Sequence, residues 1–395
     1  MIAVTTVALL ALFLGAGLAQ GASPEGSPAA QPAALGLTVR SDGMLIREGR
    51  PYRGIGVNYF DAFARHLADP HNTSYDAGFA ALAKAQISFA RIEGCGFWPK
   101  EQRLYQEDPR EFFRRFDDVV RCAEKHKIGL IPSLFWADFT VPDLVGESLD
   151  QWGNPASKTR AYMRTYVRDV VTRYRTSPAI WGWELGNEYN LAADLPNAAQ
   201  HRPPVVPQLG TANSRTAKDE LTYAVVRAAF VAFAEEVRKY DDSRVISTGN
   251  SRPRESAWHN WKEKSWKTDT PEQQARMLRD DNPDPVDLVS VHLYDVPTGY
   301  VDAMAGIARR LHKPLFVGEF GAGSAHGAAS ERERFQTLLA AIEHAKVPLA
   351  ALWVYDYQWQ DRTFNITWSN ARSYQLKAIA EANARIRKAL AEETE

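Results

Sequence analysis

The sequence has 395 residues, 45% of them hydrophobic, which is enough for one large core in a single α/β barrel domain. Lysine and arginine total 47 against 48 aspartates and glutamates, so net charge favours neither nucleic acid nor an anionic membrane as a partner. Neutral or weakly charged substrates suit this balance best.

The first 19 residues, Met1 to Ala19, are apolar and uncharged and end in the small residues that a signal-peptidase site needs. We expect a signal peptide over residues 1–19, a flexible leader over 20–35 and the folded domain over 36–395. The protein is then secreted or periplasmic. An uncleaved membrane anchor is the alternative, because the segment is just long enough to cross a bilayer and lacks an initial lysine or arginine.

Residues 37–52 alternate apolar and polar side chains around two glycine turns, which predicts a short β-ribbon at one end of the domain. Eight apolar runs follow, separated by segments of helical periodicity, and this alternation is typical of a (β/α)8 TIM barrel. The predicted strands are residues 54–59, 87–93, 128–135, 179–189, 244–249, 286–294, 313–321 and 348–355. The predicted helices are residues 75–84, 109–126, 158–174, 221–240, 301–311 and 373–391, with one more opened by a capping box, Ser330-Glu-Arg-Glu333.

Two of the predicted strands deliver a glutamate at their carboxyl ends, Glu188 in the fourth and Glu319 in the seventh. A parallel barrel gathers these ends at one face, where active sites lie, so we expect the two carboxylates to meet. Such a pair, flanking a glycosidic bond, can act as general acid/base and nucleophile. The loop after Glu188, residues 190–218, is too long for an ordinary connection, and we expect it to form a wall or lid of the cleft.

Other strand ends carry side chains that can serve this pair. Arg91 can keep Glu319 ionised by its charge, and Tyr294 can donate a hydrogen bond to Glu319. His292 can orient Glu188 or tune its protonation. We expect the surroundings to raise the pKa of Glu188, so that it can protonate a leaving oxygen.

Sugar-binding residues are expected at the same face. Asn187 can bind a sugar 2-hydroxyl, and Trp353 offers a flat floor for a sugar ring. Five further tryptophans lie near predicted loops and can stack on additional rings, although for each one singly ordinary packing is the better explanation. They are Trp98, Trp136, Trp152, Trp359 and Trp368.

Taken singly, these residues have structural explanations, since an Asn-Glu pair after a strand is common and an arginine can pair with any barrel carboxylate. Their joint placement at five strand ends is what favours catalysis. We expect no metal and no cofactor, because the sequence has no phosphate-binding loop or dinucleotide fingerprint and its scattered histidines lack metal-ligand spacing. Two cysteines are too few for a cysteine-based zinc site, and Cys95 and Cys122 either pair or stay as buried thiols.

These motifs resemble the retaining glycoside hydrolases of clan A, most closely family 5, the cellulase and mannanase family. The similarity covers residues 37–391, and residues 116–133 look like the mannanase branch. The matching motifs are Trp183-Glu-Leu-Gly-Asn-Glu188, His292-Leu-Tyr294 and Gly318-Glu-Phe-Gly321, with Arg91 and Trp353. Leu134-Phe-Trp136 departs from the histidine or asparagine that many members carry there.

The resemblance implies a (β/α)8 barrel, net retention, no obligatory cofactor, Glu188 as acid/base and Glu319 as nucleophile. We therefore expect an exported, monomeric enzyme that cleaves neutral β-1,4-linked poly- or oligosaccharide, either mannan or glucan. Two alternatives stay open. One is an exo-acting β-glycosidase on short oligosaccharides, with residues 190–218 closing one end of the cleft, and the other is a carbohydrate-binding barrel without catalysis.

Overall fold

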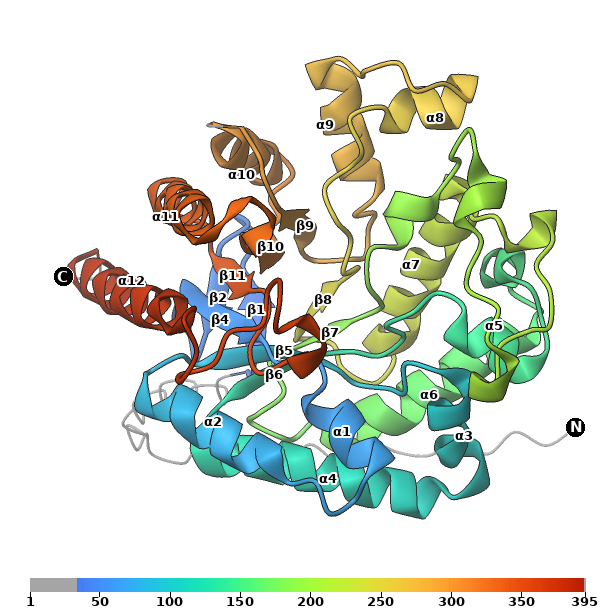
Figure 1. The fold of residues 1–395 in the computed structure, drawn as a ribbon, viewed down its shortest axis with the longest axis horizontal. Coiled ribbons are helices and arrows are strands. Elements are labelled where there is room, and N and C mark those ends of the chain that lie inside the picture. Colours follow the sequence, from blue (N-terminus) through green and yellow to red (C-terminus); the bar gives the residue numbers. More distant parts are fainter. Residues whose placement is uncertain (1–33, 298, 394–395) are drawn as a thin grey trace, which may run out of the picture. The chain divides into compact units, whose positions relative to one another are not determined.

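Eight parallel strands form a ring that helices surround (Figure 1). The computed structural model describes residues 34–297 and 299–393, so the expected signal peptide and most of the leader lie outside the described residues. The strands, in their order around the ring, are β8 (Val245–Ser247), β7 (Gly182–Glu184), β6 (Gly129–Ser133), β5 (Phe89–Glu93), β4 (Gly54–Asn58), β11 (Leu349–Leu352), β10 (Leu315–Phe320) and β9 (Val289–Leu293). The predicted TIM barrel is confirmed.

The ring closes between β8 and β9, which share no strand ladder in the part of the chain that the structure describes. The backbone amides of Asp287 and Leu288 donate to the carbonyl of Ile246 at 3.0 and 3.3 Å. The Ser290 hydroxyl donates to the carbonyl of Asn250 at 3.0 Å. These bonds close the ring between β8 and β9, and the carboxyl ends of the eight parallel strands lie at one mouth.

Helices fill the connections between strands, and two of them match the predicted bounds. The side chain of Asp108 accepts from the amide of Glu111 and opens α4 (Pro109–His126), and Ser157 caps α6 (Lys158–Tyr174) in the same way. The other predicted helices are α2 (Ser74–Lys84), α7 (Tyr223–Arg238), α10 (Tyr300–Arg310), α11 (Ala328–His344) and α12 (Ser373–Glu392). The helices that the sequence analysis missed are α1 (Ala62–Ala68), α3 (Pro99–Glu107), α5 (Thr140–Val145), α8 (Ala257–Glu263) and α9 (Pro271–Asp280). No helix among the described residues is long and apolar enough to cross a membrane.

The predicted start of α11 is wrong. The helix begins at Ala328, and the residue before it, Gly327, has φ +86°. Ser330 therefore lies inside the helix and caps nothing. The amide of Glu331 donates to the carbonyl of Gly327 at 3.0 Å, so the first helical turn is already formed at Ser330. The Glu331 carboxylate accepts from the Nε of Arg372 at 3.0 Å and from the hydroxyl of Tyr374 at 3.2 Å.

The amino-terminal ribbon closes the end of the barrel opposite the mouth. Its antiparallel strands are β1 (Leu37–Val39), β2 (Leu45–Arg47) and β3 (Arg50–Pro51). The amide of Leu37 donates to the carbonyl of Trp181 at 2.8 Å. Leu37 and Leu45 belong to one apolar cluster with Trp181, just before β7, and with Phe89 and Leu349, the first residues of β5 and β11. The predicted β-ribbon is confirmed.

Both cysteines are free and buried. Cys95 lies just after β5, where its Sγ accepts from the amide of Trp136 at 3.4 Å. Cys122 lies on α4, on the outside of the barrel. Of the two alternatives left open, the structure has the unpaired thiols.

Candidate active site

Glu319 lies near the end of β10 with its side chain 5% exposed, and three residues contact its carboxylate. Arg91 Nη1 donates to one oxygen at 2.8 Å, and the Tyr294 hydroxyl donates to the other at 2.6 Å. Nδ1 of His292 lies 3.6 Å from the first oxygen. Burial and the negative charge of Glu319 raise the pKa of Tyr294 well above its usual value, so this hydroxyl stays a proton donor.

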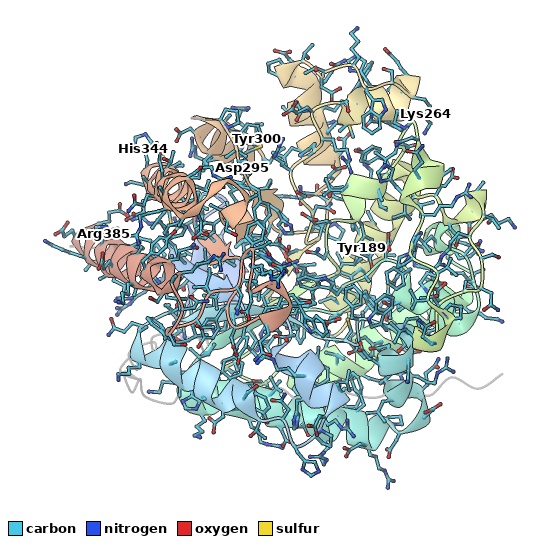
Figure 2. All side chains as sticks on the ribbon, in the orientation of Figure 1. Tyr189, Lys264, Asp295, Tyr300, His344 and Arg385 are labelled. Carbon is cyan, nitrogen blue, oxygen red and sulfur yellow. The ribbon has the colours of Figure 1, made fainter. Side chains whose placement is uncertain are left out.

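Glu188 lies on the loop after β7 and is more open, with its side chain 31% exposed. Its backbone has φ +55°, and its amide donates to the carbonyl of Gly249 at 2.9 Å. Its carboxylate is 2.9 Å from Nδ1 of His292. The next residue, Tyr189, labelled in Figure 2, donates its hydroxyl to the carbonyl of Phe135 at 2.7 Å. These bonds fix the loop and leave the carboxylate facing the mouth.

The predicted direction of the Glu188 pKa shift is wrong. Burial raises the pKa, but the hydrogen bond and charge of His292, the Ser251 hydroxyl and the charge of Arg91 outweigh burial. The pKa therefore lies below its ordinary value in this structure. The sequence showed the buried strand before Glu188, but it did not show that these donors would converge on the carboxylate.

Arg91 is fully buried and forms ion pairs with Glu184 on β7 and Glu319 on β10. Its Nε donates to Glu184 on β7 at 2.6 Å, and its Nη2 donates to the Asn187 side-chain oxygen at 2.8 Å. Its guanidinium also lies over the ring of Trp136, 4.5 Å from the ring centre. The sequence analysis missed Glu184, the second residue of its own Trp183-to-Glu188 motif, because only the fold shows that it faces Arg91.

A hollow of about 480 Å³ opens above the two glutamates, and aromatic rings form most of its lining. Trp136 and Trp353 stack at 6.2 Å between ring centres, and Trp353 Nε1 donates to Gln360 at 2.9 Å. The lining residues are Phe60, Phe97, Trp136, Asn187, Glu188, Tyr294, Glu319, Trp353, Tyr357, Gln360 and Phe364. His292 lies beneath them, fully buried. Phe60, Phe97, Tyr357 and Phe364 were missed, since phenylalanine and tyrosine in loops give no signal apart from core packing.

The remaining tryptophan candidates do not line this hollow. Trp152 is fully buried, and Trp98 packs against Phe97 and Phe139. Trp359 is 89% exposed, and Trp368 is half-buried. Of the five, only Trp136 lies in the hollow.

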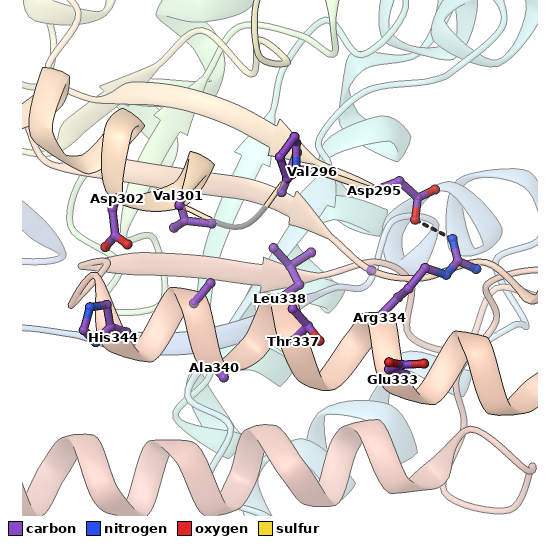
Figure 3. A pocket seen from close by; sticks show the side chains of 14 residues that line it. Asp295, Val296, Val301, Asp302, Glu333, Arg334, Thr337, Leu338, Ala340 and His344 are labelled. Atoms are coloured by element: carbon purple, nitrogen blue, oxygen red, sulfur yellow. Dashed lines mark hydrogen bonds and ion pairs between the residues drawn. The ribbon is translucent and has the colours of Figure 1, made fainter.

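Other hollows lack the paired carboxylates. Figure 3 shows one of about 560 Å³ between α10 and α11, where Asp295 pairs with Arg334. Asp302 and His344 also line it, and both come from these outer helices rather than from strand ends. The hollow that is lined by a pair of carboxylates from strand ends is the one above Glu188 and Glu319.

The expected wall made by residues 190–218 does not border that hollow. This loop contains the short 3-10 helices η2 (Tyr189–Ala192), η3 (Ala198–His201), η4 (Pro207–Leu209) and η5 (Ala217–Asp219). Arg215 binds Asp143 of α5 through two bonds of 2.6 and 2.7 Å, and η4 packs on α3. The loop is thus fastened to the outer helices.

The spacing of the two carboxylates limits their chemistry. One oxygen of Glu188, one of Glu319 and a nitrogen of His292 all lie within 4.8 Å of one another. Retaining glycosidases hold their carboxyl groups about 5–5.5 Å apart, whereas inverting enzymes need about 6.5–9.5 Å to admit water. The same three groups are of metal-ligating types, but the Arg91 cation already donates at 2.8 Å to the Glu319 oxygen that faces His292.

Residues 69–358 match the model of the cellulase family, glycosyl hydrolase family 5. The chain belongs to this family. The match includes Arg91, Glu188, His292 and Glu319. The resemblance drawn from the sequence motifs is therefore confirmed.

Similar proteins include mannan-degrading enzymes. A probable mannan endo-1,4-β-mannosidase A of Aspergillus flavus is 28% identical over 207 residues, which are 47% of this chain and 52% of that protein, so the chain spans about half of this relative's length. An endo-1,4-β-mannanase from Rhizomucor miehei has a TM-score of 0.62 at 16% identity, covering 89% of this chain and 99% of that one. An exo-β-1,4-mannosidase from an Opitutaceae bacterium has a TM-score of 0.61 at 16% identity, covering 89% and 63%. At this identity the two structures support the shared fold.

Proposed function

We propose that the protein is a retaining β-glycoside hydrolase that cleaves neutral β-1,4-linked polysaccharide, with mannan as its substrate. The observation that carries the proposal is the pair Glu188 and Glu319, whose oxygens approach within 4.8 Å at the floor of an aromatic hollow. A carbohydrate-binding barrel without catalysis has no need of a buried arginine and tyrosine on one of these carboxylates.

In the proposed mechanism, Glu319 attacks the anomeric carbon. Arg91 and Tyr294 occupy both of its oxygens and hold it ionised and in place, and attack forms a covalent glycosyl ester. Glu188 protonates the leaving oxygen in this first step. It then takes a proton from water, which hydrolyses the ester and restores both carboxyl groups.

The lowered pKa of Glu188 means that substrate must help it to act as an acid. A sugar in the hollow displaces water from the exposed part of this carboxyl, and desolvation raises the pKa. The negative charge of Glu319 acts in the same direction. When Glu319 forms the covalent ester, it loses its negative charge. The pKa of Glu188 then falls, which favours the ionised form that the second step requires.

Substrate identity rests on the relatives and on the chemistry of the hollow. The A. flavus relative and the R. miehei structure are both named for action on β-1,4-linked mannan. The stacked rings of Trp136 and Trp353 suit the apolar faces of neutral sugars. The side-chain oxygen of Asn187 accepts from Arg91, so its amide nitrogen remains the donor for a sugar hydroxyl.

We propose endo action. An exo-acting enzyme would need residues 190–218 to close one end of the cleft. These residues are instead bound to α3 and α5 and do not line the hollow. We further propose that the protein is exported, because residues 1–19 have the composition of a signal peptide, and that it acts as a monomer.

The test is product analysis after incubation with mannan, carboxymethylcellulose, xylan and β-1,3-glucan. We expect mixed oligosaccharides from mannan, and Glu319→Ala should lower kcat by about 10⁴-fold or more while the protein stays folded. Glu333→Ala, which removes an exposed glutamate of α11, is the matched control and should keep full activity. Monosaccharide alone would indicate exo action. Glycan binding without hydrolysis, or normal turnover by Glu319→Ala, would overturn the proposal.

A further inference from the structure

A cluster of side chains of metal-ligating types lies on the outside of the barrel, away from the hollow. Asp76 is in the first turn of α2, and Cys122 and His126 lie one turn apart near the end of α4. One ligand atom of each side chain lies within 4.8 Å of the other two. None of the three lines the hollow above the catalytic glutamates.

The three side chains converge on one atom. Oδ1 of Asp76 lies 3.2 Å from the Sγ of Cys122 and 2.6 Å from the Nε2 of His126. A tetrahedral zinc ion, with bonds of about 2.0–2.3 Å, separates its ligand atoms by roughly 3.3–3.6 Å. The side chains need only small rotations to reach this spacing.

We propose that Asp76, Cys122 and His126 form a site for a divalent zinc-like ion that links α2 to α4. Thiolate and imidazole ligands select borderline metals such as Zn²⁺ over Mg²⁺ or Ca²⁺, and the carboxylate supplies the third ligand. The helix itself supports the geometry, because residues four apart lie on the same face. Asp76 and His126 are both partly exposed, so a water molecule can take the fourth position.

Two groups must change before the ion binds: the Lys125 ammonium must move away from Asp76, and the Cys122 thiol must lose its proton. Lys125 Nζ lies 3.1 and 3.2 Å from the two oxygens of Asp76, but the lysine side chain is 62% exposed and can turn into solvent. The thiol of Cys122 must lose its proton when the metal binds. Bound Zn²⁺ then balances the charges of one thiolate and one carboxylate.

No metal site was expected from the sequence, because two cysteines are too few for a cysteine-based zinc site and the histidines are scattered. His126 nevertheless follows Cys122 by four residues within a helix that was predicted correctly. The third ligand, Asp76, lies on a separate helix. Only the packing of α2 on α4 brings it to the pair.

The test uses Co²⁺ as a spectroscopic probe on the full-length protein after removal of metals by chelation. We expect a thiolate-to-cobalt charge-transfer absorption that saturates at one ion per chain and disappears when Zn²⁺ is added. Cys122→Ser should abolish this band. Asp76→Asn, a milder change at a partly exposed position, should weaken Co²⁺ binding by about 10-fold or more.

Two controls separate this site from other ligands. Cys95→Ser removes the other thiol and should keep the band, and His71→Asn removes an exposed histidine outside the cluster and should bind Co²⁺ normally. Zn²⁺ should raise the Tm of the wild type by about 2–4 °C and leave the Tm of Cys122→Ser unchanged. Absence of the band in the wild type, or its persistence in Cys122→Ser, would show that the cluster is only a hydrogen-bonded contact between helices.

Discussion

The two ends of the barrel are built on the same eight strands, but the side chains buried at one end are apolar and many of those buried at the other end are charged. At the amino end, Leu37 and Leu45 of the ribbon close over Trp181, Phe316 and Leu349, and each of these apolar side chains is at most 2% exposed. Burial of apolar surface stabilises the fold without any need for directional partners. None of these residues lines the hollow above the two glutamates, so this end supports the fold.

The carboxyl end is buried to nearly the same degree, but its core carries charge. Arg91 and Glu184 are 0% exposed, and Glu319 is 4% exposed. Removing such groups from water costs several kcal/mol for each ion, and their mutual attraction often only offsets this cost. We propose that the charged network is kept for its effect on the charge and position of Glu319, and that the apolar end supplies stability that offsets the cost of the buried charges.

Arg91→Met should have the largest effect, because it leaves Glu184 and Glu319 buried without their cation. We expect the free energy of unfolding to fall by about 3–5 kcal/mol, and kcat/KM to fall by about 10³-fold. Urea unfolding and hydrolysis assays measure the two losses. An Arg91→Met protein as stable as the wild type would contradict the description of the carboxyl end.

Trp181→Ala is the matching change at the amino end. Trp181 packs on Tyr52 with 5.4 Å between ring centres, and its removal leaves a cavity that should cost about 3–5 kcal/mol. We expect kcat/KM to remain at the wild-type value at temperatures where the variant is folded. A loss of activity comparable to that of Arg91→Met would show that the two ends are not separate in function.

The pH dependence of stability measures the cost of burying the charge of Asp281. It is fully buried beside Asn190 and Arg227, and burial raises its pKa from an ordinary 3.8 to about 7. Because the folded state then holds its proton more tightly than the unfolded state does, this residue makes stability fall as pH rises from about 4 to 7. Asp281→Asn should remove this contribution, on the order of 1–3 kcal/mol. If the curves of Tm against pH for the wild type and Asp281→Asn run parallel, Asp281 does not contribute to the pH dependence of stability.

His292→Ala should have a smaller effect on pH dependence. The hydrogen bond and charge of His292 are the main influences that lower the pKa of Glu188, so their loss should raise that pKa. The protonated acid then persists to higher pH, and the alkaline limb of kcat/KM should move upward by about one pH unit. The pH profile of the variant checks this shift. A limb that stays in place would mean that His292 serves only to position Glu188.

The residues that the sequence predicted well are those whose position in a barrel follows from their position in a strand. Glu188, Glu319, His292 and Tyr294 follow apolar runs, and parallel strands bring such ends to one mouth whatever the intervening loops do. The hydrogen bond from Tyr294 to Glu319 is present as predicted. Their catalytic roles remain a proposal.

The features that the sequence did not predict depend on contacts between distant elements. Glu184 faces Arg91, which lies two strands away along the ring. Ser330 is no cap because α11 begins at Ala328, where the amide of Glu331 already donates to the carbonyl of Gly327, and the Glu331 side chain pairs with Arg372, just before α12. The loop over residues 190–218 was expected at the cleft, but Arg215 fastens it to α5 instead. Thr270 shows the opposite case, since its capping box with Gln273 is a local motif that opens α9, a helix that was nevertheless missed.

The central claim is that Glu319 attacks the sugar directly, and the anomeric configuration of the first product tests it. Proton NMR of a β-mannooligosaccharide digest, followed from the first minute with purified wild-type protein, should show the β-anomer before mutarotation produces the α-anomer. That order follows from two displacements at one carbon. Initial appearance of the α-anomer would mean that water attacks in a single step, and would contradict the role proposed for Glu319.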